Sequence, residues 1–159
     1  MDVFKQQYEL VRSTRKFLLK FCGSIPREKL VKEIPEFNYS CMSMLLVHIA
    51  NCYVFWIANF SLKKEAEYYK DEHPYSIDEI SEMFIKADEY VYEFIDKFLI
   101  TPDINVTGYN PWLKKVMPCS PLSIFSHVIT HEFHHKGQMM TMSRLLGYTP
   151  PDTDLIRFE

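Results

Sequence analysis

The histidines are the residues of this sequence best suited to chemistry, because four of the six lie within nine residues: His127, His131, His134 and His135. A helix turns about 100° per residue, so His131 and His135 lie about 40° apart on one face, with His127 in the same row. Burying several neutral imidazoles is unfavourable unless each finds a partner, and a divalent metal is a partner for two at once. The spacing therefore predicts a metal site that includes His131 and His135, with His134 in a supporting contact.

A third metal ligand is expected from a distant part of the chain. Residues 37–62 contain no Asp, Glu, Lys or Arg, and His48 is the one histidine in this uncharged stretch. We therefore predict that His48 joins His131 and His135. Three imidazoles favour Zn²⁺ or Ni²⁺, with Fe²⁺ and Mn²⁺ as further candidates, and they leave a coordination position for water or substrate.

Two other side chains compete for places in this site. Cys52 lies one helical turn after His48 and could bind metal as a thiolate. His127 lies in the same row as the predicted pair and could take the place of His135. His73 lies in a charged stretch, and we expect it to be an ordinary surface histidine.

Residues 131–135 also match the H-E-x-x-H pattern of zinc proteases, in which Glu132 would be the general base. The longer protease motif requires glycine and histidine where this sequence has Gln138 and Thr141, and we expect no strand ahead of the motif to hold a peptide. A protease is therefore a remote alternative. The E-x-x-H signature of di-iron bundles is also present, but a second copy of it is absent from the sequence.

Helical spacing dominates the chain, and we expect four helices. The first covers residues 3–21; Gly23 suits the position after a helix, and Pro26 forbids the helix from continuing. The second covers residues 40–62, and its inward face is expected to carry Cys41, Leu45, His48, Cys52 and Phe55. The charged residues 63–73 are expected to form a solvated helix end and a loop.

The last two helices have clear start signals. Ser76 and Glu79 have the spacing of a capping box, and Ser120 with Pro121 forms a typical cap and first position. Residues 100–119, with three prolines and one glycine, are expected to form a long connection without regular structure, of the kind that often covers a site. Since no segment alternates like a strand, the predicted fold is an all-α, four-helix bundle.

Composition limits the classes of protein that this chain can represent. Its 159 residues, 47% hydrophobic and 25% charged, are typical of one soluble domain covering residues 1–159. The net charge of −3 argues against nucleic-acid binding. The four cysteines form no C-x-x-C pair and no secretory signal is visible, so we expect reduced thiols and a cytoplasmic location. The polar residues of the uncharged stretch favour a buried core helix over a membrane span.

Two groups of residues together resemble the DinB family. They are His48-Ile-Ala followed by Trp56, and the run from His127 to Gln138 with its H-x-x-x-H-K-G-Q block. The resemblance implies a four-helix bundle in up-down-down-up order with long connections. It also implies a divalent metal between one histidine of the second helix and the H-x-x-x-H pair of the last. Carried over by position, these ligands are His48, His131 and His135.

The resemblance implies two kinds of enzyme. Some members are S-transferases or isomerases that use bacillithiol, mycothiol or glutathione, and others are described as metal-dependent hydrolases. A non-catalytic, stress-associated metal-binding module is the alternative. Partners would be a small-molecule substrate and a low-molecular-weight thiol, with no nucleic acid or membrane, and homodimers are expected because relatives often pair.

Catalytic and thiol-binding residues are less well defined than the metal ligands. Glu132 and Tyr109 are weak candidates for catalysis. A thiol that carries sugar and carboxylate groups would need polar and cationic residues at the mouth of the site. The candidates are Arg12, Arg15, Tyr109, Lys114 and Lys115. Lys136 stands where arginine is commoner in the family, so it keeps the charge but lacks the bidentate fork.

Overall fold

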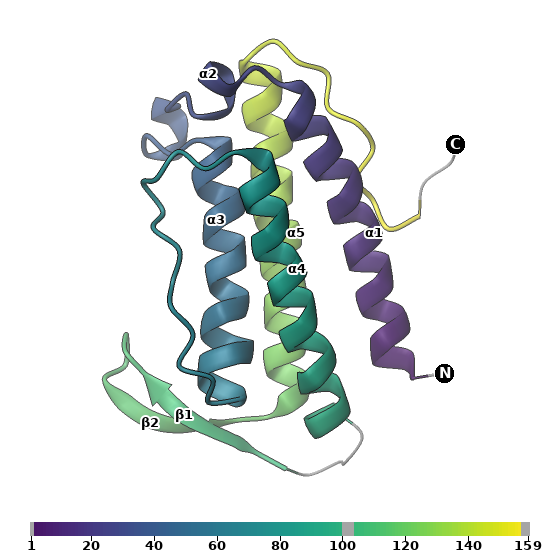
Figure 1. Ribbon diagram of the computed structural model, residues 1–159, viewed down its shortest axis with the longest axis vertical. Coiled ribbons are helices and arrows are strands. Elements are labelled where there is room, and N and C mark those ends of the chain that lie inside the picture. Colours follow the sequence, from purple (N-terminus) through teal and green to yellow (C-terminus); the bar gives the residue numbers. More distant parts are fainter. Residues whose placement is uncertain (1, 100–103, 157–159) are drawn as a thin grey trace.

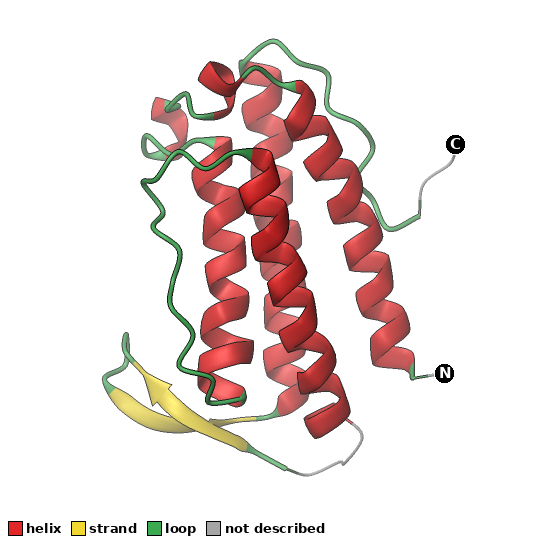
Figure 2. Cartoon of the chain, viewed as in Figure 1, coloured by secondary structure: helices red, strands yellow, loops and turns green. Residues whose placement is uncertain are grey.

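The computed structural model describes residues 2–99 and 104–156 and is mostly helical (Figures 1 and 2). The long helices are α1 (Val3–Ser24), α3 (Met42–Tyr53), α4 (Ile77–Phe94) and α5 (Pro121–Leu145). Shorter helical elements are α2 (Arg27–Leu30), the 3₁₀ turn η1 (Pro35–Phe37) and the π-helices η2 (Val54–Ser61) and η3 (Ile95–Leu99). The strands are β1 (Val106–Asn110) and β2 (Lys115–Cys119).

The four long helices pack around one hydrophobic core. α3 contacts both α4 and α5, and α1 contacts the same two helices from the other side. In Figure 1, α1 and α5 run in one direction while α3 and α4 run in the other. Because α3 and α4 are parallel, the segment between η2 and α4 must travel the length of the molecule. Figure 1 shows this segment, residues 62–76, as an extended stretch that we call the strap.

The predicted start signals of the last two long helices are confirmed. The Ser76 hydroxyl accepts a hydrogen bond from the Glu79 amide while the Glu79 carboxylate accepts from the Ser76 amide, which completes the capping box. The Ser120 hydroxyl accepts from the Ser123 amide, and Pro121 follows it at the first helical position. These local contacts satisfy backbone donors that the first turn leaves unpaired.

The predicted stop at Gly23 is wrong, because α1 continues to Ser24. The helix ends where Ile25 takes an extended conformation, with φ −86° and ψ 131°, directly before Pro26. A residue before proline is disfavoured in the helical region, so the proline and not the glycine sets the boundary.

The uncharged second segment forms two kinds of helix. α3 changes at Val54 into the π-helix η2, in which the Leu62 amide donates to the carbonyl of Ile57, five residues earlier. Among the described residues, the stretch Met42–Ser61 is long and apolar enough to cross a membrane, but 67% of its most apolar window is buried inside the protein. This burial supports its role as a core helix.

The long connection that we expected to lack regular structure contains an antiparallel hairpin, so that expectation is wrong for residues 106–119; residues 100–103 lie outside the described chain. The fold is therefore mostly helical and not all-α, and the expectation of no strand ahead of residues 131–135 is also wrong. Val106 pairs with Cys119 and Asn110 with Lys115. β1 buries alternate residues, but the middle inward position is Gly108, which has no side chain to give an apolar pattern.

Gly108 lets the hairpin lie directly against η2. A Cβ atom at this position would be 2.6 Å from Cδ2 of Phe60, and Phe60 is itself buried. The Lys63 ammonium adds a second link, since it donates to the carbonyls of Phe60 and Thr107. The hairpin is therefore fixed across the end of the bundle by contact with an aromatic ring.

We expect Gly108→Ala to lower the free energy of unfolding by about 1–3 kcal/mol, because the added methyl group overpacks the contact with Phe60. Urea unfolding followed by circular dichroism measures the change. Gly137→Ala is the matched control: this exposed helical glycine has open space around its Cβ position, and alanine there should raise stability by about 0.5–1 kcal/mol. Equal effects of the two substitutions would contradict this account of the hairpin.

Candidate metal centre

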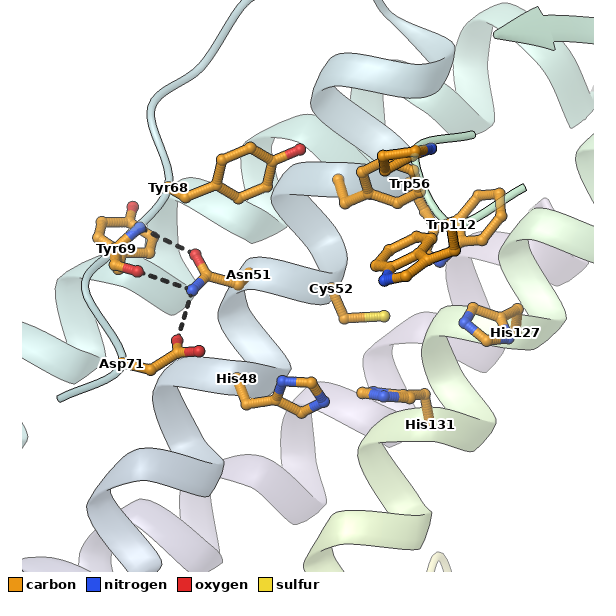
Figure 3. A pocket seen from close by; sticks show the side chains of 12 residues that line it. His48, Asn51, Cys52, Trp56, Tyr68, Tyr69, Asp71, Trp112, His127 and His131 are labelled. Carbon is orange, nitrogen blue, oxygen red and sulfur yellow. Dashed lines mark hydrogen bonds between the residues drawn. The ribbon is translucent and has the colours of Figure 1, made fainter. Parts of the chain in front are cut away.

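The structure brings together the three histidines predicted as metal ligands. His48 on α3 and the pair His131 and His135 on α5 each offer a ring nitrogen, and these nitrogens all lie within 4.8 Å of one another. Ring centroids are 5.0 Å apart for His48 and His131 and 4.4 Å apart for His131 and His135. Figure 3 shows the rings of His48 and His131 pointing toward each other from facing helices. Imidazoles separated by 83 positions in the sequence therefore share one small volume.

The hydrogen bonds of this cluster suit a cation. Nδ1 of His135 lies 2.6 Å from Oε1 of Gln138, which can only accept, so the proton is on Nδ1 and Nε2 presents its lone pair. That Nε2 lies 3.2 Å from Nε2 of His131. Nδ1 of His131 is buried and has no hydrogen-bond partner in the described part of the chain. A divalent metal would satisfy the facing nitrogens together, so these residues fit the group that the sequence implied.

The surroundings of His131 and His135 also disfavour protonation of their imidazole rings. Burial, reinforced by the neighbouring imidazoles, lowers the pKa of His131 to about 3, and burial also lowers the pKa of His135. Both rings are therefore neutral at neutral pH. Metal ligation requires the neutral imidazole, so these two ligands would lose no proton on binding.

One side of the histidine cluster opens into a cavity of about 500 Å³, which we call the aromatic cavity (Figure 3). Its lining residues come from α3, η2, the strap, the hairpin turn and α5. They are His48, Asn51, Cys52, Phe55, Trp56, Tyr68, Tyr69, Asp71, Pro111, Trp112, His127 and His131. The volume lies in the range of small-molecule sites.

The predicted inward face of the second helix is wrong in one respect. α3 is buried on almost all sides, and His48 is the exposed residue of the row that we expected to point into the core. Leu45, Cys52 and Phe55 in this row keep 9% of their surface exposed. His48, Cys52 and Phe55 of this row line the cavity, and so the histidine can meet a ligand from solvent.

The two alternative ligands lie beside the cluster. Cys52 lines the cavity, but burial raises the pKa of its thiol to about 12, so it stays protonated at neutral pH. His127 packs its ring against Trp56 at 5.2 Å and is 5.6 Å from the ring of His131. Among the described residues, neither belongs to the group whose ligand atoms converge.

Glu132, our weak candidate for catalysis, points into the protein core and away from the cavity. Its carboxylate is 1% exposed and forms an ion pair with Arg15, with Nη2 and Oε2 2.8 Å apart. The Tyr53 hydroxyl donates to the same oxygen at 2.7 Å. Because this carboxylate is fully engaged in the core, the arrangement of a zinc protease, with its general base beside the metal, is absent here.

The Arg15 network joins all four long helices. Besides Glu132 on α5 and Tyr53 on α3, the Arg15 guanidinium of α1 pairs with Asp88 of α4 at 2.6 Å. Arg12 binds the other oxygen of Asp88 at 2.7 Å. Arg12 and Arg15, which we expected at the mouth of the site, are therefore structural residues between helices, and neither lines the cavity.

The remaining candidates for thiol binding also lie elsewhere. Tyr109, Lys114 and Lys115 are exposed residues of the hairpin, and none of the three lines the cavity. Lys136 is buried, where its ammonium donates to Thr14 and lies 3.7 Å from the centroid of the Phe133 ring. Among the residues that the structure describes, no lysine or arginine lines the cavity.

Asn51 is a functional residue that the sequence did not reveal. Its amide donates to the Tyr69 carbonyl at 2.8 Å and accepts from the Tyr69 amide at 2.9 Å, and it also donates to Asp71. Asn59 forms the same paired contact with the backbone of Ala66. These asparagines explain the polar residues of the uncharged stretch, since they hold the strap against the helix. They thereby place Tyr69 and its neighbours at the cavity edge.

The comparison with known families agrees with the expected identity. The family model described as the DinB family matches residues 1–159. The chain belongs to the DinB family. A solved structure, a DinB-like protein from Bacillus cereus ATCC 10987, matches with a TM-score of 0.66 and 21% identity over 94% of each chain. This likeness shows the DinB-like fold. No curated protein matches the chain.

Replacing His131 by alanine is expected to remove zinc binding, because two of the three converging nitrogens cannot complete the site. Zinc per chain, measured by elemental analysis after loading and gel filtration, should fall from about one to near zero. His73→Ala is the control, since this exposed histidine lies outside the converging group. Full zinc content in the His131 variant would refute the site.

Glu132→Gln is expected to reduce stability and to leave zinc content unchanged. The substitution leaves the buried Arg15 guanidinium without the charge of its closest carboxylate on α5, which should cost about 3 kcal/mol in the free energy of unfolding. Urea unfolding of the metal-free variant measures the loss, and elemental analysis measures zinc. The side-chain carbonyl of glutamine can still accept a hydrogen bond from Arg15 and so hold α5 in its orientation. A folded variant that has lost its zinc would therefore contradict the structural role of Glu132.

Proposed function

We propose that this DinB-family protein is a metal-dependent enzyme that transfers a low-molecular-weight thiol to a small electrophile. The observation that carries the proposal is the position of the three histidines: their nitrogens converge at the wall of a cavity open to ligand. A closed structural metal site would instead be surrounded by protein on all sides. The cavity likewise favours an enzyme over a non-catalytic metal-binding module.

His48, His131 and His135 would hold the metal. A bound divalent metal supplies Lewis acidity, which lowers the pKa of a thiol and favours the nucleophilic thiolate. In the overall reaction the thiol loses its proton and its sulfur bonds to the electrophilic carbon. Then either a leaving group departs or a proton is returned to the product.

The groups around the histidines support thiol transfer better than hydrolysis. Hydrolysis in the manner of a zinc protease would use Glu132 as a base, but its carboxylate accepts hydrogen bonds from Arg15 and Tyr53 in the core. The thiol is expected to come from outside the chain, because Cys52 does not belong to the described group of converging ligand atoms. A small thiol cosubstrate meets both conditions.

Other features of the family resemblance belong to the same proposal. The up-down-down-up order is supported by the helix directions in Figure 1. Zinc or nickel suits three imidazole ligands. A cytoplasmic location would supply reduced thiols. Homodimers are expected from the resemblance.

The proposal is tested by following thiol loss with the metal-loaded full-length protein. Glutathione, bacillithiol and mycothiol are each combined with a panel of alkyl halides, epoxides and activated alkenes, using zinc-loaded and nickel-loaded protein. At least one combination should consume thiol about tenfold faster than without protein, a barrier reduction of about 1.4 kcal/mol or more. His131→Ala should lose this acceleration and His73→Ala should keep it.

Glu132→Gln separates the two chemistries, when assayed at a temperature where the variant is folded. Thiol transfer should persist, because Glu132 does not face the cavity. The proposal is wrong if no combination of metal, thiol and electrophile is accelerated. It is also wrong if the acceleration survives in the His131 variant.

A further inference from the structure

The walls of the aromatic cavity show which kind of molecule it would accept. Both tryptophans of the chain, Trp56 from η2 and Trp112 from the hairpin turn, line it (Figure 3). Phe55 lines it with them. Trp112 is 70% exposed, although burial of its large ring would be favourable. An exposed indole beside a cavity offers a flat surface that a ligand would cover.

The rings are held in fixed positions by contacts with one another. The centroid of Phe55 is 4.8 Å from that of Trp56 and 4.8 Å from that of Trp112, and both pairs meet edge to face. Trp56 is held on its other side by His127 at 5.2 Å. Edge-to-face contacts leave ring faces available for stacking, so the cavity has preorganised apolar surfaces.

Among the described lining residues of the cavity, none is a lysine or arginine that would offset a negative charge on a ligand, and Asp71 is the one carboxylate. In the metal-free protein, an anionic group placed against these rings would therefore lose hydration without gaining a partner, and it would also meet the negative charge of Asp71.

We infer that the aromatic cavity binds a planar aromatic group that brings no negative charge against its rings, and that Trp112 determines this specificity. The inference rests on the proposed function in one respect, since this group would belong to the electrophile that the thiol attacks. The position of Trp112 depends on the hairpin, which Gly108 allows to lie against Phe60. The part of the fold that the sequence did not predict thus supplies the recognition surface.

The test uses two ligands that share one ring system and differ in charge: naphthalenemethanol and naphthoate. Each is titrated into ¹⁵N-labelled protein after chelator treatment, so that the carboxylate cannot be recruited by a metal. The two indole N–H signals in NMR spectra report on the cavity, because both tryptophans line it. We expect the alcohol to shift these signals and to bind at least tenfold more tightly than naphthoate.

Substitutions in the hairpin locate the binding surface. Trp112→Ala should weaken binding of the alcohol at least tenfold, as read from the Trp56 indole, whereas Trp112→Phe should retain binding within about threefold. Val116→Ala is the matched control, because this exposed residue of the same hairpin does not line the cavity, and its affinity should be unchanged. Binding of naphthoate as tight as that of the alcohol, or unchanged affinity in Trp112→Ala, would overturn the inference.

The outcome is separable from that of the proposed function. If the alcohol binds but no thiol is consumed, the proposed reaction fails and the assignment of the cavity stands. If thiol transfer is observed while the indole signals do not respond to the alcohol, the reaction stands and the cavity assignment fails.

Discussion

The ion pair between Arg15 and Glu132 is the interaction on which the geometry of the site depends. Arg15 is 3% exposed and Glu132 1% exposed, so each charge requires the other. On α5, Glu132 lies about 100° from His131 and about 60° from His135 around the helix axis. Holding Glu132 against α1 therefore fixes the rotation of α5 and turns both histidines toward α3.

The same network limits how far the helices can shift against one another. Asp88 and Tyr53 extend it to α4 and α3, so a single guanidinium has partners on all the other long helices. Buried ion pairs often contribute little net stability, because desolvation offsets their attraction. Buried ion pairs nevertheless require a strict geometry between their charged groups. Here that geometry keeps the helices aligned so that the imidazoles on α3 and α5 face one another.

The cavity results from two departures from regular helical packing. The π-helix η2 continues α3 with a wider turn and carries Phe55 and Trp56 at the end of the bundle. The hairpin crosses the same end and brings Trp112 to within 4.8 Å of Phe55. π-helical turns are rare, and those that occur are often found at functional sites. The position of this one beside the histidines agrees with that tendency. The imidazoles of the candidate metal site thus lie beside the apolar wall that Phe55, Trp56 and Trp112 form.

The sequence by itself determined the elements whose signals are local. The caps at Ser76 and Ser120 are predicted from neighbouring residues. That His131 and His135 share one face of their helix follows from helical spacing alone. The approach of His48 could be suggested only because a histidine in an uncharged stretch needs a partner. Tertiary structure decided the rest. The direction of the Glu132 side chain depends on its contact with Arg15, 117 positions away, and the position of the hairpin depends on the contact of Gly108 with the Phe60 ring. Such contacts leave no periodic pattern in the chain.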